Sequence, residues 1–368
     1  MKILLIGDYS NVHATLAKGL RHLGHEVIVA SDGDGWKNYP RDIDLCRPSL
    51  GKFDTLRYLL RLERIMRGLR GFDVVQLIGP DFLPLKAKRI VRYYKMLRKN
   101  NARVFLGAFG MDRYYVEACL DCQTFRYSDF NFGSQIRKSD ENHCFIADWR
   151  DGDKGRLNEL IACDCDGIVS GLYEYHAAYL KVFPGKLRFI PFPVIVPPEK
   201  SADEPDFERP VRFFIGIMRS RSVYKGTDVM LRALQCVQER FGRLVHIERV
   251  ENVPFSEYRQ MLAGSDVLLD QLYSYTPAMN ALEAMAQGLV VVGGGEPENY
   301  EILGETQLRP IVNVQPNEQS VFEALCRLVE HREELPRLKR ESIEYIRRYH
   351  DAVKVAQQYL DFWTARKP

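Results

Sequence analysis

Long apolar runs are missing from this sequence. No stretch of its 368 residues reaches the roughly 20 apolar residues that a membrane-spanning helix requires. The apolar run at 2–7 ends at once in Asp8, so it is too short for a signal-peptide core, and no small-residue cleavage site follows it. We therefore expect a cytoplasmic protein in which this run is a buried first strand.

Cysteine is also sparse. Eight cysteines in a chain without a secretion signal predict free thiols rather than a disulfide framework. The pairs Cys119-x-x-Cys122, His143-Cys144 and Cys163-x-Cys165 raise the alternative of structural zinc, but their spacings match no familiar zinc pattern. We predict scattered thiols and no metal site.

The glycine-rich nucleotide motifs are absent as well. The first strand runs into "GDYSNVH", which holds only Gly7 where a dinucleotide fold requires G-x-G-x-x-G, and the chain has no P-loop. A nicotinamide or flavin dehydrogenase is therefore disfavoured. Gly7 and Asp8 predict a tight turn, and Ser10 or Asn11 a helix cap. Such a turn can bind a polar ligand, although capping alone also explains these residues.

What the sequence has in excess is positive charge in one region. Residues 57–103 hold 13 Lys and Arg against three acidic residues, although the net charge of the whole chain is only +3. The segments 57–70 and 86–103 have apolar residues at helical spacing, which predicts amphipathic helices with basic faces. These faces are either solvated or bind anionic lipid or a lipid-linked anionic acceptor. No motif indicates nucleic-acid binding.

Short Val/Ile/Leu-rich runs alternate with helical patterns along the whole chain, which is typical of parallel sheets covered on both faces. Six prolines between 191 and 210 mark a linker. We predict an α/β protein with two tandem doubly wound, Rossmann-like domains facing a cleft. The expected domains are 1–195 and 196–345, and 346–368 would form a C-terminal helix that packs back on the first domain.

Basic residues gather at one turn of the second half. "FFIGIMRSRSVYKGTDVMLRAL" holds Arg219, Arg221 and Lys225 between a strand and a helix that opens near 227. Cations that converge beside a helix N-terminus suit a diphosphate. The alternative is a solvated basic turn.

A second helix start follows in "YSYTPAMNALEAMAQG". Thr276 and Pro277 predict its N-cap and first turn, which would aim unpaired N–H groups at a ligand. Glu283, one turn into that helix, suits the hydroxyl groups of a ribose or is simply exposed. Gly294 and Gly295 would let backbone N–H groups approach the ligand closely.

The order of these features resembles group-1 (family-4-type) glycosyltransferases of GT-B fold. The resemblance rests on strand-Gly-x-x-basic-Lys-Gly, "SDVLLDQ" and "EAMAQGLVVVGGGEPE". It implies a nucleotide-diphosphate sugar in the second domain and an acceptor in the first. Glu283 would hold the ribose, and Lys225 with Arg219 or Arg221 would bind the diphosphate and stabilise its departing charge. Thr276, Gly294 and Gly295 would complete the donor site, with Gly7 contributing from the first domain. No metal or other cofactor is implied.

Two residues depart from the family pattern. Tyr275 stands where the first acid of E-x7-E is expected, and Ile217 stands where the family has Arg. Tyr275 can donate a hydrogen bond near the transferred sugar but carries no charge at neutral pH. The resemblance implies retention of configuration, but Tyr275 leaves the outcome, and the sugar transferred, open.

The first half supplies candidates for the acceptor. "FLGAFGMDRYY" places Gly110 and Asp112 after a strand, and Asp112 is a candidate for orienting the acceptor or moving a proton. A helix cap is the alternative. Asp8, Asn11 and His13 are further acceptor candidates. The prediction is a cytoplasmic glycosyltransferase, peripheral to the membrane where its basic helices meet lipid, that glycosylates a glycan or lipid-linked acceptor. A nucleotide-sugar epimerase and a non-catalytic sugar-nucleotide-binding protein are the alternatives.

Overall fold

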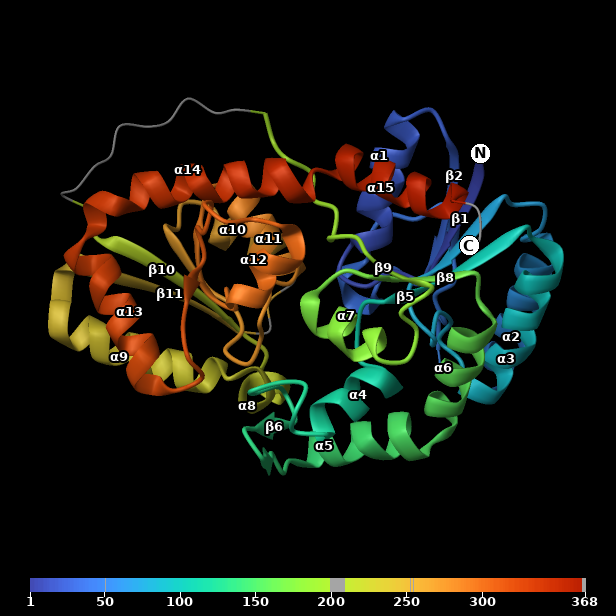
Figure 1. Cartoon of the computed structure of the whole chain (residues 1–368), viewed down its shortest axis with the longest axis horizontal. Coiled ribbons are helices and arrows are strands. Elements are labelled where there is room, and N and C mark those ends of the chain that lie inside the picture. The colour runs from blue at the N-terminus through green and yellow to red at the C-terminus, as the bar shows by residue number, and fades with distance from the viewer. Residues whose placement is uncertain (50, 199–208, 252, 254, 366–368) are drawn as a thin grey trace. The chain divides into compact units, whose positions relative to one another are not determined.

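The computed structural model describes residues 1–49, 51–198, 209–251, 253 and 255–365. The chain divides into two compact units, which are described separately (Figure 1). Unit 1 consists of Met1–Phe125, Ser134–Pro193 and Ala352–Pro368, and unit 2 of Arg126–Gly133 and Val194–Asp351. The predicted linker falls largely on residues 199–208, which lie outside the described residues.

Unit 1 is built on a seven-stranded sheet in the order β3-β2-β1-β4-β5-β8-β9, and every pairing is parallel. Runs such as KILLI and VVQL form its centre because their side chains are buried on both faces. The strands are β1 (Lys2–Ile6), β2 (Glu26–Ser31), β3 (Ile43–Asp44), β4 (Val74–Leu77), β5 (Arg103–Ala108), β8 (Gly167–Ser170) and β9 (Leu187–Phe189). The short β7 (Gln135–Ile136) also belongs to this unit.

Helices cover both faces of this sheet. The helix α1 (Val12–His22) packs against α15 (Ala352–Thr364), whereas α2 (Lys52–Gly68) packs against α3 (Ala87–Asn100) and α3 against α6 (Asp153–Asp164). Because parallel crossovers are right-handed, α2 and α3 lie on the face opposite α1. The remaining helices are α4 (Arg113–Leu120), α5 (Asp140–Phe145), the π-helix η2 (Ile146–Asp151) and α7 (Tyr173–Leu180).

Unit 2 has a five-stranded parallel sheet in the order β11-β10-β12-β13-β14. Its strands are β10 (Val211–Ile217), β11 (Val245–Glu251), β12 (Val267–Leu269), β13 (Val290–Gly293) and β14 (Val312–Asn313), and the short β6 (Asn131–Phe132) belongs to the same unit. Val194 and Asp351 pair as a bridge, so the chain enters and leaves the main segment of unit 2 side by side.

The helices of unit 2 follow its strands in the same alternating way. They are α8 (Ser222–Lys225), α9 (Thr227–Phe241), α10 (Phe255–Leu262), α11 (Met279–Ala286), α12 (Pro297–Leu303), α13 (Glu318–Glu330), α14 (Leu335–Tyr345) and the π-helix η6 (Ile346–His350). The helix α9 packs against α13, and apolar side chains from both join those of the sheet in one core. The predicted α/β class with two doubly wound parallel sheets is confirmed.

One predicted helix boundary is wrong. The helix expected to open at Thr276 begins at Met279 instead, with Ala278 as its N-cap residue. Ala278 has extended backbone angles, with φ −81° and ψ 176°, so the helix cannot include the residues before it. Pro277 thus lies in a loop rather than in the first turn. In the described part of the chain, no helix combines the length and the apolar character needed to cross a membrane.

Candidate active site

The strand order of unit 2 reverses its direction at one point of the sheet. The strand β10 pairs with β11 on one side and with β12 on the other, so the chain passes from β10 to β11 in one direction and then crosses back over β10 to β12. In doubly wound sheets, ligands bind outside the carboxyl ends of the two strands at such a switch point. Here those ends are Ile217 of β10 and Leu269 of β12.

The basic turn follows β10 directly. Arg219 is largely exposed and donates a 2.6 Å hydrogen bond to Glu251 at the end of β11. The guanidinium group of Arg221 lies 5.2 Å from the centre of the Tyr224 ring, within cation–π range. Lys225 is half-buried and ends α8. The three predicted cations therefore share one turn, but each has a different neighbour.

The positive charge of Lys225 lies near a half-buried carboxyl group, that of Asp270, which was not predicted from the sequence. Asp270 follows β12, and burial raises the pKa of its carboxyl group, while the positive charge of Lys225 and a 3.1 Å hydrogen bond from Asn280 oppose that rise. The signal in the sequence was an aspartate directly after the buried strand VLL, where polar side chains meet the sheet edge. Lys225, Asp270 and Asn280 therefore meet at the switch point, from three different elements.

Glu283 lies one turn beyond Asn280 on α11 and is half-buried. Its charge adds to burial in raising the pKa of the Tyr258 hydroxyl, so the two groups are close. Tyr258 in turn covers Gly216 near the end of β10, where an added Cβ atom would lie 2.6 Å from the Tyr258 ring. Glu283 is thus near the switch point of unit 2.

Gly294 and Gly295 follow β13. A Cβ atom at Gly294 would lie 2.5 Å from the carbonyl oxygen of Ser274, so this glycine permits close approach of two backbone segments rather than of backbone and ligand. The N–H of Gly295 donates to the side chain of Asn313 at 3.1 Å. Thr276 is buried in the loop opposite, where its carbonyl oxygen accepts a hydrogen bond from the hydroxyl of Ser274.

Tyr275 is buried and holds a segment from the first half of the chain. Its hydroxyl oxygen accepts a 2.7 Å hydrogen bond from the N–H of Arg126, and the Arg126 guanidinium lies 4.9 Å from the centre of its ring. The rings of Tyr275 and Tyr127 have centres 4.9 Å apart. The position of the family's first acid therefore serves here to attach Arg126–Gly133 to unit 2.

The same segment converges on Glu296, a buried carboxylate that the sequence reasoning also missed. Glu296 accepts hydrogen bonds from Tyr127 at 2.7 Å and from Arg126 at 2.8 Å. Asn313 and Gln315 donate to it at 3.1 and 3.0 Å. Nothing in the local sequence distinguishes Glu296 from a surface glutamate, because its partners lie far away in the chain.

Unit 1 has a cavity of about 760 Å³ at its own switch point, outside the carboxyl ends of β1 and β4. Gly7 and Asp8 line it from the loop after β1, and the loop after β4 supplies a mainly apolar wall from Ile78 to Leu85. Ionisable side chains also line it: Asp8, Asp32, Arg47, Asp81, Lys86, Arg89 and Lys154.

Two of the carboxyl groups that line this cavity have pKa values that burial raises. Burial raises the pKa of Asp8 to about 7, although its oxygens accept hydrogen bonds from the N–H groups of His13 and Ala14. Burial also raises the pKa of Asp81, which accepts a short hydrogen bond from the hydroxyl of Tyr9. Asp8 can therefore exchange a proton more readily near neutral pH than an ordinary carboxylate can.

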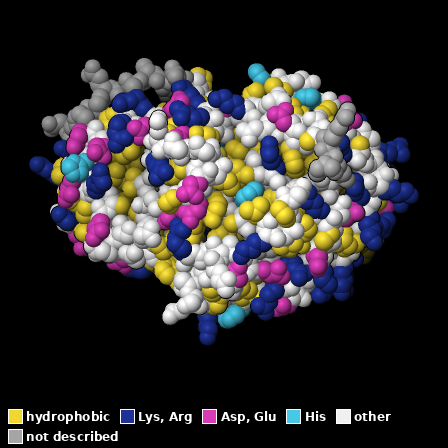
Figure 2. Space-filling model, in the orientation of Figure 1, with side chains coloured by type: hydrophobic (Ala, Val, Ile, Leu, Met, Phe, Trp, Pro, Cys, Tyr) yellow, Lys and Arg dark blue, Asp and Glu magenta, His cyan; other side chains and the backbone are white. Residues whose placement is uncertain are grey.

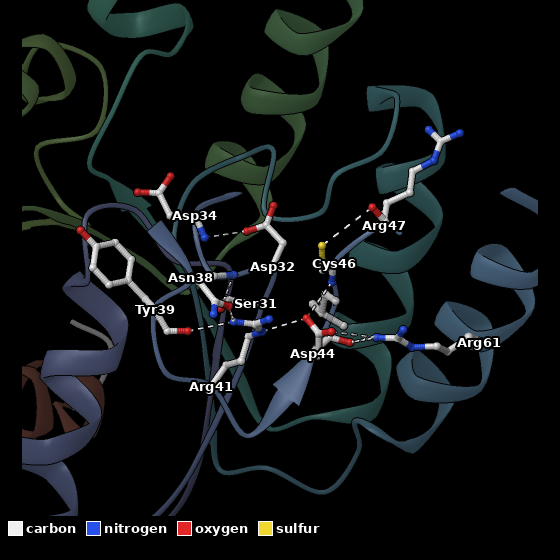
Figure 3. Close-up of polar contacts among 12 residues, drawn as sticks. Ser31, Asp32, Asp34, Asn38, Tyr39, Arg41, Asp44, Cys46, Arg47 and Arg61 are labelled. Carbon is white, nitrogen blue, oxygen red and sulfur yellow. Dashed lines mark hydrogen bonds and ion pairs between the residues drawn. The ribbon is translucent and has the colours of Figure 1, made fainter. Parts of the chain in front are cut away.

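A polar network fixes the loop after β2 beside this cavity (Figure 3). Arg41 and Arg61 both contact Asp44, and the N–H of Asp34 donates to Asp32 at 3.1 Å. The carboxylate of Asp34 accepts from the N–H of Ser10 at 2.9 Å, which joins this loop to the one after β1. Asp32 and Asp34 are thus loop carboxylates whose hydrogen bonds hold the loop in place.

The other residues predicted for the acceptor lie in structural positions. Asp112 caps α4, where it accepts from the N–H of Tyr115 at 2.9 Å and from the hydroxyl of Tyr179 at 2.7 Å. His13 is fully buried, and burial lowers its pKa to about 3, while its Nδ1 atom lies 2.7 Å from the carbonyl oxygen of Gly7. Asn11 is the N-cap residue of α1, and Gly110 lies beside the ring of Tyr9.

The predicted free thiols are present: all eight cysteines are unpaired by disulfide bonds. Among the described side chains, no group of three or more His, Cys, Asp or Glu has an arrangement that could hold a metal ion.

No family model and no curated protein sequence matches the chain. Solved structures do match it over nearly its whole length. The chain has the GT-B fold.

Three solved structures illustrate the likeness. Sucrose-phosphate synthase from Thermosynechococcus elongatus is 14% identical, with a TM-score of 0.60, and the match covers 99% of this chain and 98% of that one. Anabaena HepE, solved with UDP and glucose, is 11% identical, with a TM-score of 0.59 and 98% coverage of both chains. The UDP-GlcNAc 2-epimerase from Neisseria meningitidis, bound to UDP-GlcNAc, is 11% identical, with a TM-score of 0.54 and coverage of 98% and 99%.

Proposed function

We propose that this protein is a cytoplasmic glycosyltransferase. Unit 2 would bind a nucleotide-diphosphate sugar, and unit 1 would bind a glycan or lipid-linked acceptor in its 760 Å³ cavity. The observation that carries the proposal is the meeting of Lys225, Asp270 and Asn280 at the switch point of unit 2, with Glu283 one turn further along α11. Solved structures of the same fold hold UDP or UDP-sugars, which supports this choice of donor.

In this proposal Lys225 contacts the diphosphate. An arriving diphosphate would bring a further anionic group to Lys225, whose positive charge already opposes the rise that burial causes in the pKa of Asp270. Arg221, on the same turn, adds a second positive group, and no metal is required for this neutralisation. Removing one such donor from a leaving group typically lowers the turnover rate by roughly 10²–10³-fold. Glu283 would accept hydrogen bonds from the ribose hydroxyls.

The acceptor side of the proposal rests on the cavity in unit 1. Asp8 and Asp81 are the carboxyl groups there with raised pKa values, and either can accept the proton of an attacking hydroxyl group. Asp112 and His13 would act by holding α4 and the loop after β1 in place. Tyr275 would act in the same indirect way, by positioning Arg126–Gly133.

Nucleotide binding tests the donor site. Thermal-shift measurements would compare UDP, GDP and ADP and their sugars on wild type, Glu283→Ala and the control Gln287→Ala, which removes the exposed side chain of the C-cap residue of α11. A ligand at 100 times its dissociation constant should add about 2.7 kcal/mol of stability. We expect a shift with one nucleotide class that Glu283→Ala loses and Gln287→Ala keeps. Absence of any shift at millimolar nucleotide would contradict the donor site.

A nucleotide-sugar epimerase is the second candidate, because the Neisseria epimerase shares the fold. NMR of the bound nucleotide sugar without acceptor separates the two functions. An epimerase changes the configuration of the sugar under these conditions, whereas a glycosyltransferase leaves it intact and releases nucleoside diphosphate only when an acceptor is added. A protein that binds the nucleotide sugar and does neither with a panel of lipid-linked and glycan acceptors would be a non-catalytic binding protein.

A further inference from the structure

The helix α2 exposes three large apolar side chains to solvent. Phe53 is 87% exposed, Leu56 58% and Leu60 65%. Their spacing of three and four residues places them along one face of the helix. Solvent-exposed apolar side chains grouped in this way mark a binding surface more often than isolated ones do.

The opposite face of α2 packs against the rest of unit 1. Tyr58, Leu62 and Met66 are at most 3% exposed and pack under the helix. The exposed residues are therefore not required for the core. The helix is apolar on two faces, of which only one is covered within unit 1.

Positive charge surrounds the exposed apolar face. Arg57 and Arg64 lie on the same side of α2 as Phe53 and Leu60 by helical spacing, and both are exposed. Neither has an ion-pair partner among the described residues, whereas Arg67 pairs with Glu63 at 3.0 Å. The neighbouring helix α3 adds exposed Lys and Arg side chains, and Figure 2 shows Lys and Arg gathered at the edge where α2 and α3 lie.

We propose that α2 is an interfacial helix that docks unit 1 on an anionic lipid surface. Phe53, Leu56 and Leu60 would enter the boundary between headgroups and acyl chains, and Arg57 and Arg64 would pair with lipid phosphates. Apolar residues on one side with arginines beside them are the composition of helices that lie in this boundary. Each unpaired arginine gains an anion there.

A second copy of the chain fits this surface less well. In a symmetric dimer the same patch meets itself, so the unpaired arginines around Phe53 and Leu60 would face arginines of the same kind. Like charges brought together in a buried interface oppose association. The charge of the patch therefore favours a lipid surface over self-association.

The position of the helix links this surface to the cavity of unit 1. Thr55, Tyr58 and Leu59 of α2 line that cavity, and so does Arg89 of α3. An acceptor that is anchored in lipid would thus have its polar head beside the cavity when α2 is docked. This last step rests on the proposed function, whereas the docking of α2 does not.

Vesicle sedimentation tests the docking directly, without nucleotide or acceptor. Wild-type protein would be mixed with phosphatidylcholine vesicles with and without phosphatidylglycerol, at low and high salt. One variant, Phe53→Ser/Leu56→Ser/Leu60→Ser, removes the apolar stripe. Its matched control, Leu180→Ser/Val182→Ser, removes apolar side chains of unit 1 that are 47% and 53% exposed elsewhere. A second pair compares Arg57→Glu/Arg64→Glu with Lys18→Glu/Arg188→Glu, which changes the net charge equally at other exposed positions of unit 1.

We expect wild type and both controls to bind anionic vesicles and to bind neutral vesicles weakly. Each α2 variant should lose binding by about tenfold or more, and high salt should weaken wild-type binding. Equal binding by the α2 variants and their controls would overturn the proposal, and so would a wild-type dimer that the serine variant converts to a monomer without any vesicle binding. Circular dichroism confirms that each variant is folded. Nucleotide-induced thermal shifts should be the same in all of them, so failure of the docking and failure of the donor site are separate results.

Discussion

The hydroxyl oxygen of Tyr275 accepts a hydrogen bond of 2.7 Å from the backbone N–H of Arg126, which lies 149 positions earlier in the chain. This contact joins the loop before α11 to Arg126–Gly133, the one segment from the first half of the chain that belongs to unit 2. The contact between the rings of Tyr275 and Tyr127 and the carboxylate of Glu296 support the same junction. Unit 2 therefore includes a segment that is distant in sequence from the rest of the unit.

Replacing Tyr275 with Phe should destabilise unit 2. The phenyl ring keeps the contact with the Tyr127 ring, but the N–H of Arg126 loses its acceptor in a partly buried position. A buried donor without a partner costs about 1–3 kcal/mol. Urea unfolding measures this change in the free energy of unfolding. Hydrogen exchange of the Arg126 amide should accelerate in the same variant.

A tyrosine without such a contact provides the control. The hydroxyl of Tyr359 is buried and has no hydrogen-bond partner among the described residues, so Tyr359→Phe should leave stability unchanged or raise it. Equal losses in the two variants would show that the hydroxyl of Tyr275 has no special role at the junction.

Gly294 should not tolerate a side chain. Its added Cβ atom would lie 2.5 Å from the carbonyl oxygen of Ser274 and 3.0 Å from the N atom of Thr276, and backbone atoms cannot turn aside as a side chain can. We expect Gly294→Ala to lower the melting temperature and to weaken nucleotide binding, because the loop that carries Tyr275 must shift. A loss on the order of 1–3 kcal/mol is typical of such overpacking.

The matched control for that variant is Gly68→Ala at the end of α2. No atom lies within 4 Å of a Cβ added there, and its φ is not positive. Alanine is a better helix former than glycine by up to about 1 kcal/mol, so this variant should be neutral or more stable. If both variants melt at the wild-type temperature, an added Cβ atom at Gly294 does not clash with the carbonyl oxygen of Ser274, and the close approach of the two backbone segments is contradicted.

Much of the fold could be predicted because its signals are local. Val/Ile/Leu runs such as KILLI and VVVG alternate with amphipathic helices, and this pattern specifies parallel sheets without any long-range information. The helix after Tyr275 shows the limit of such signals. Thr276 and Pro277 have the composition of a helix start, but the extended backbone at Ala278 delays the helix to Met279.

The site was predictable only where its residues lie next to strand ends in the sequence. Lys225 and Glu283 were proposed from the sequence because they belong to motifs that follow strands, and the structure places both near the switch point. Asp270 was missed although it also follows a strand, because one aspartate after a strand carries no motif. Glu296 could not be found at all, since its partners Tyr127 and Arg126 are about 170 residues away. The exposed apolar stripe on α2 could not be predicted from the sequence either, because the sequence does not show which face of the helix packs against the rest of unit 1.

The two ends of α4 should respond to pH in opposite directions. Asp112 caps the start of the helix, and burial raises its pKa to about 7 from 3.8, despite hydrogen bonds from Tyr115 and Tyr179. Its protonated form is thus favoured by folding. The stability that it contributes is complete below about pH 4 and is lost as the pH rises through about 7. Asn also caps helices well, so Asp112→Asn should remain folded.

Asp121, directly after α4, has the opposite shift. Although desolvation acts against it, hydrogen bonds from Thr124, Gln123 and Lys181 lower its pKa to about 2 from 3.8. Its contribution to stability is complete above about pH 4 and is lost as the pH falls through about 2.

Urea unfolding across the pH range distinguishes these two groups. Relative to Asp112→Asn, wild type should lose stability between about pH 4 and pH 7, by at most about 1.4 kcal/mol per pH unit. Relative to Asp121→Asn, wild type should keep a constant advantage over that range and lose it only in stronger acid. Parallel curves for wild type and Asp112→Asn would mean that Asp112 keeps an ordinary pKa. That result would require its carboxylate to be solvated in the folded protein, which its burial between Tyr115 and Tyr179 opposes.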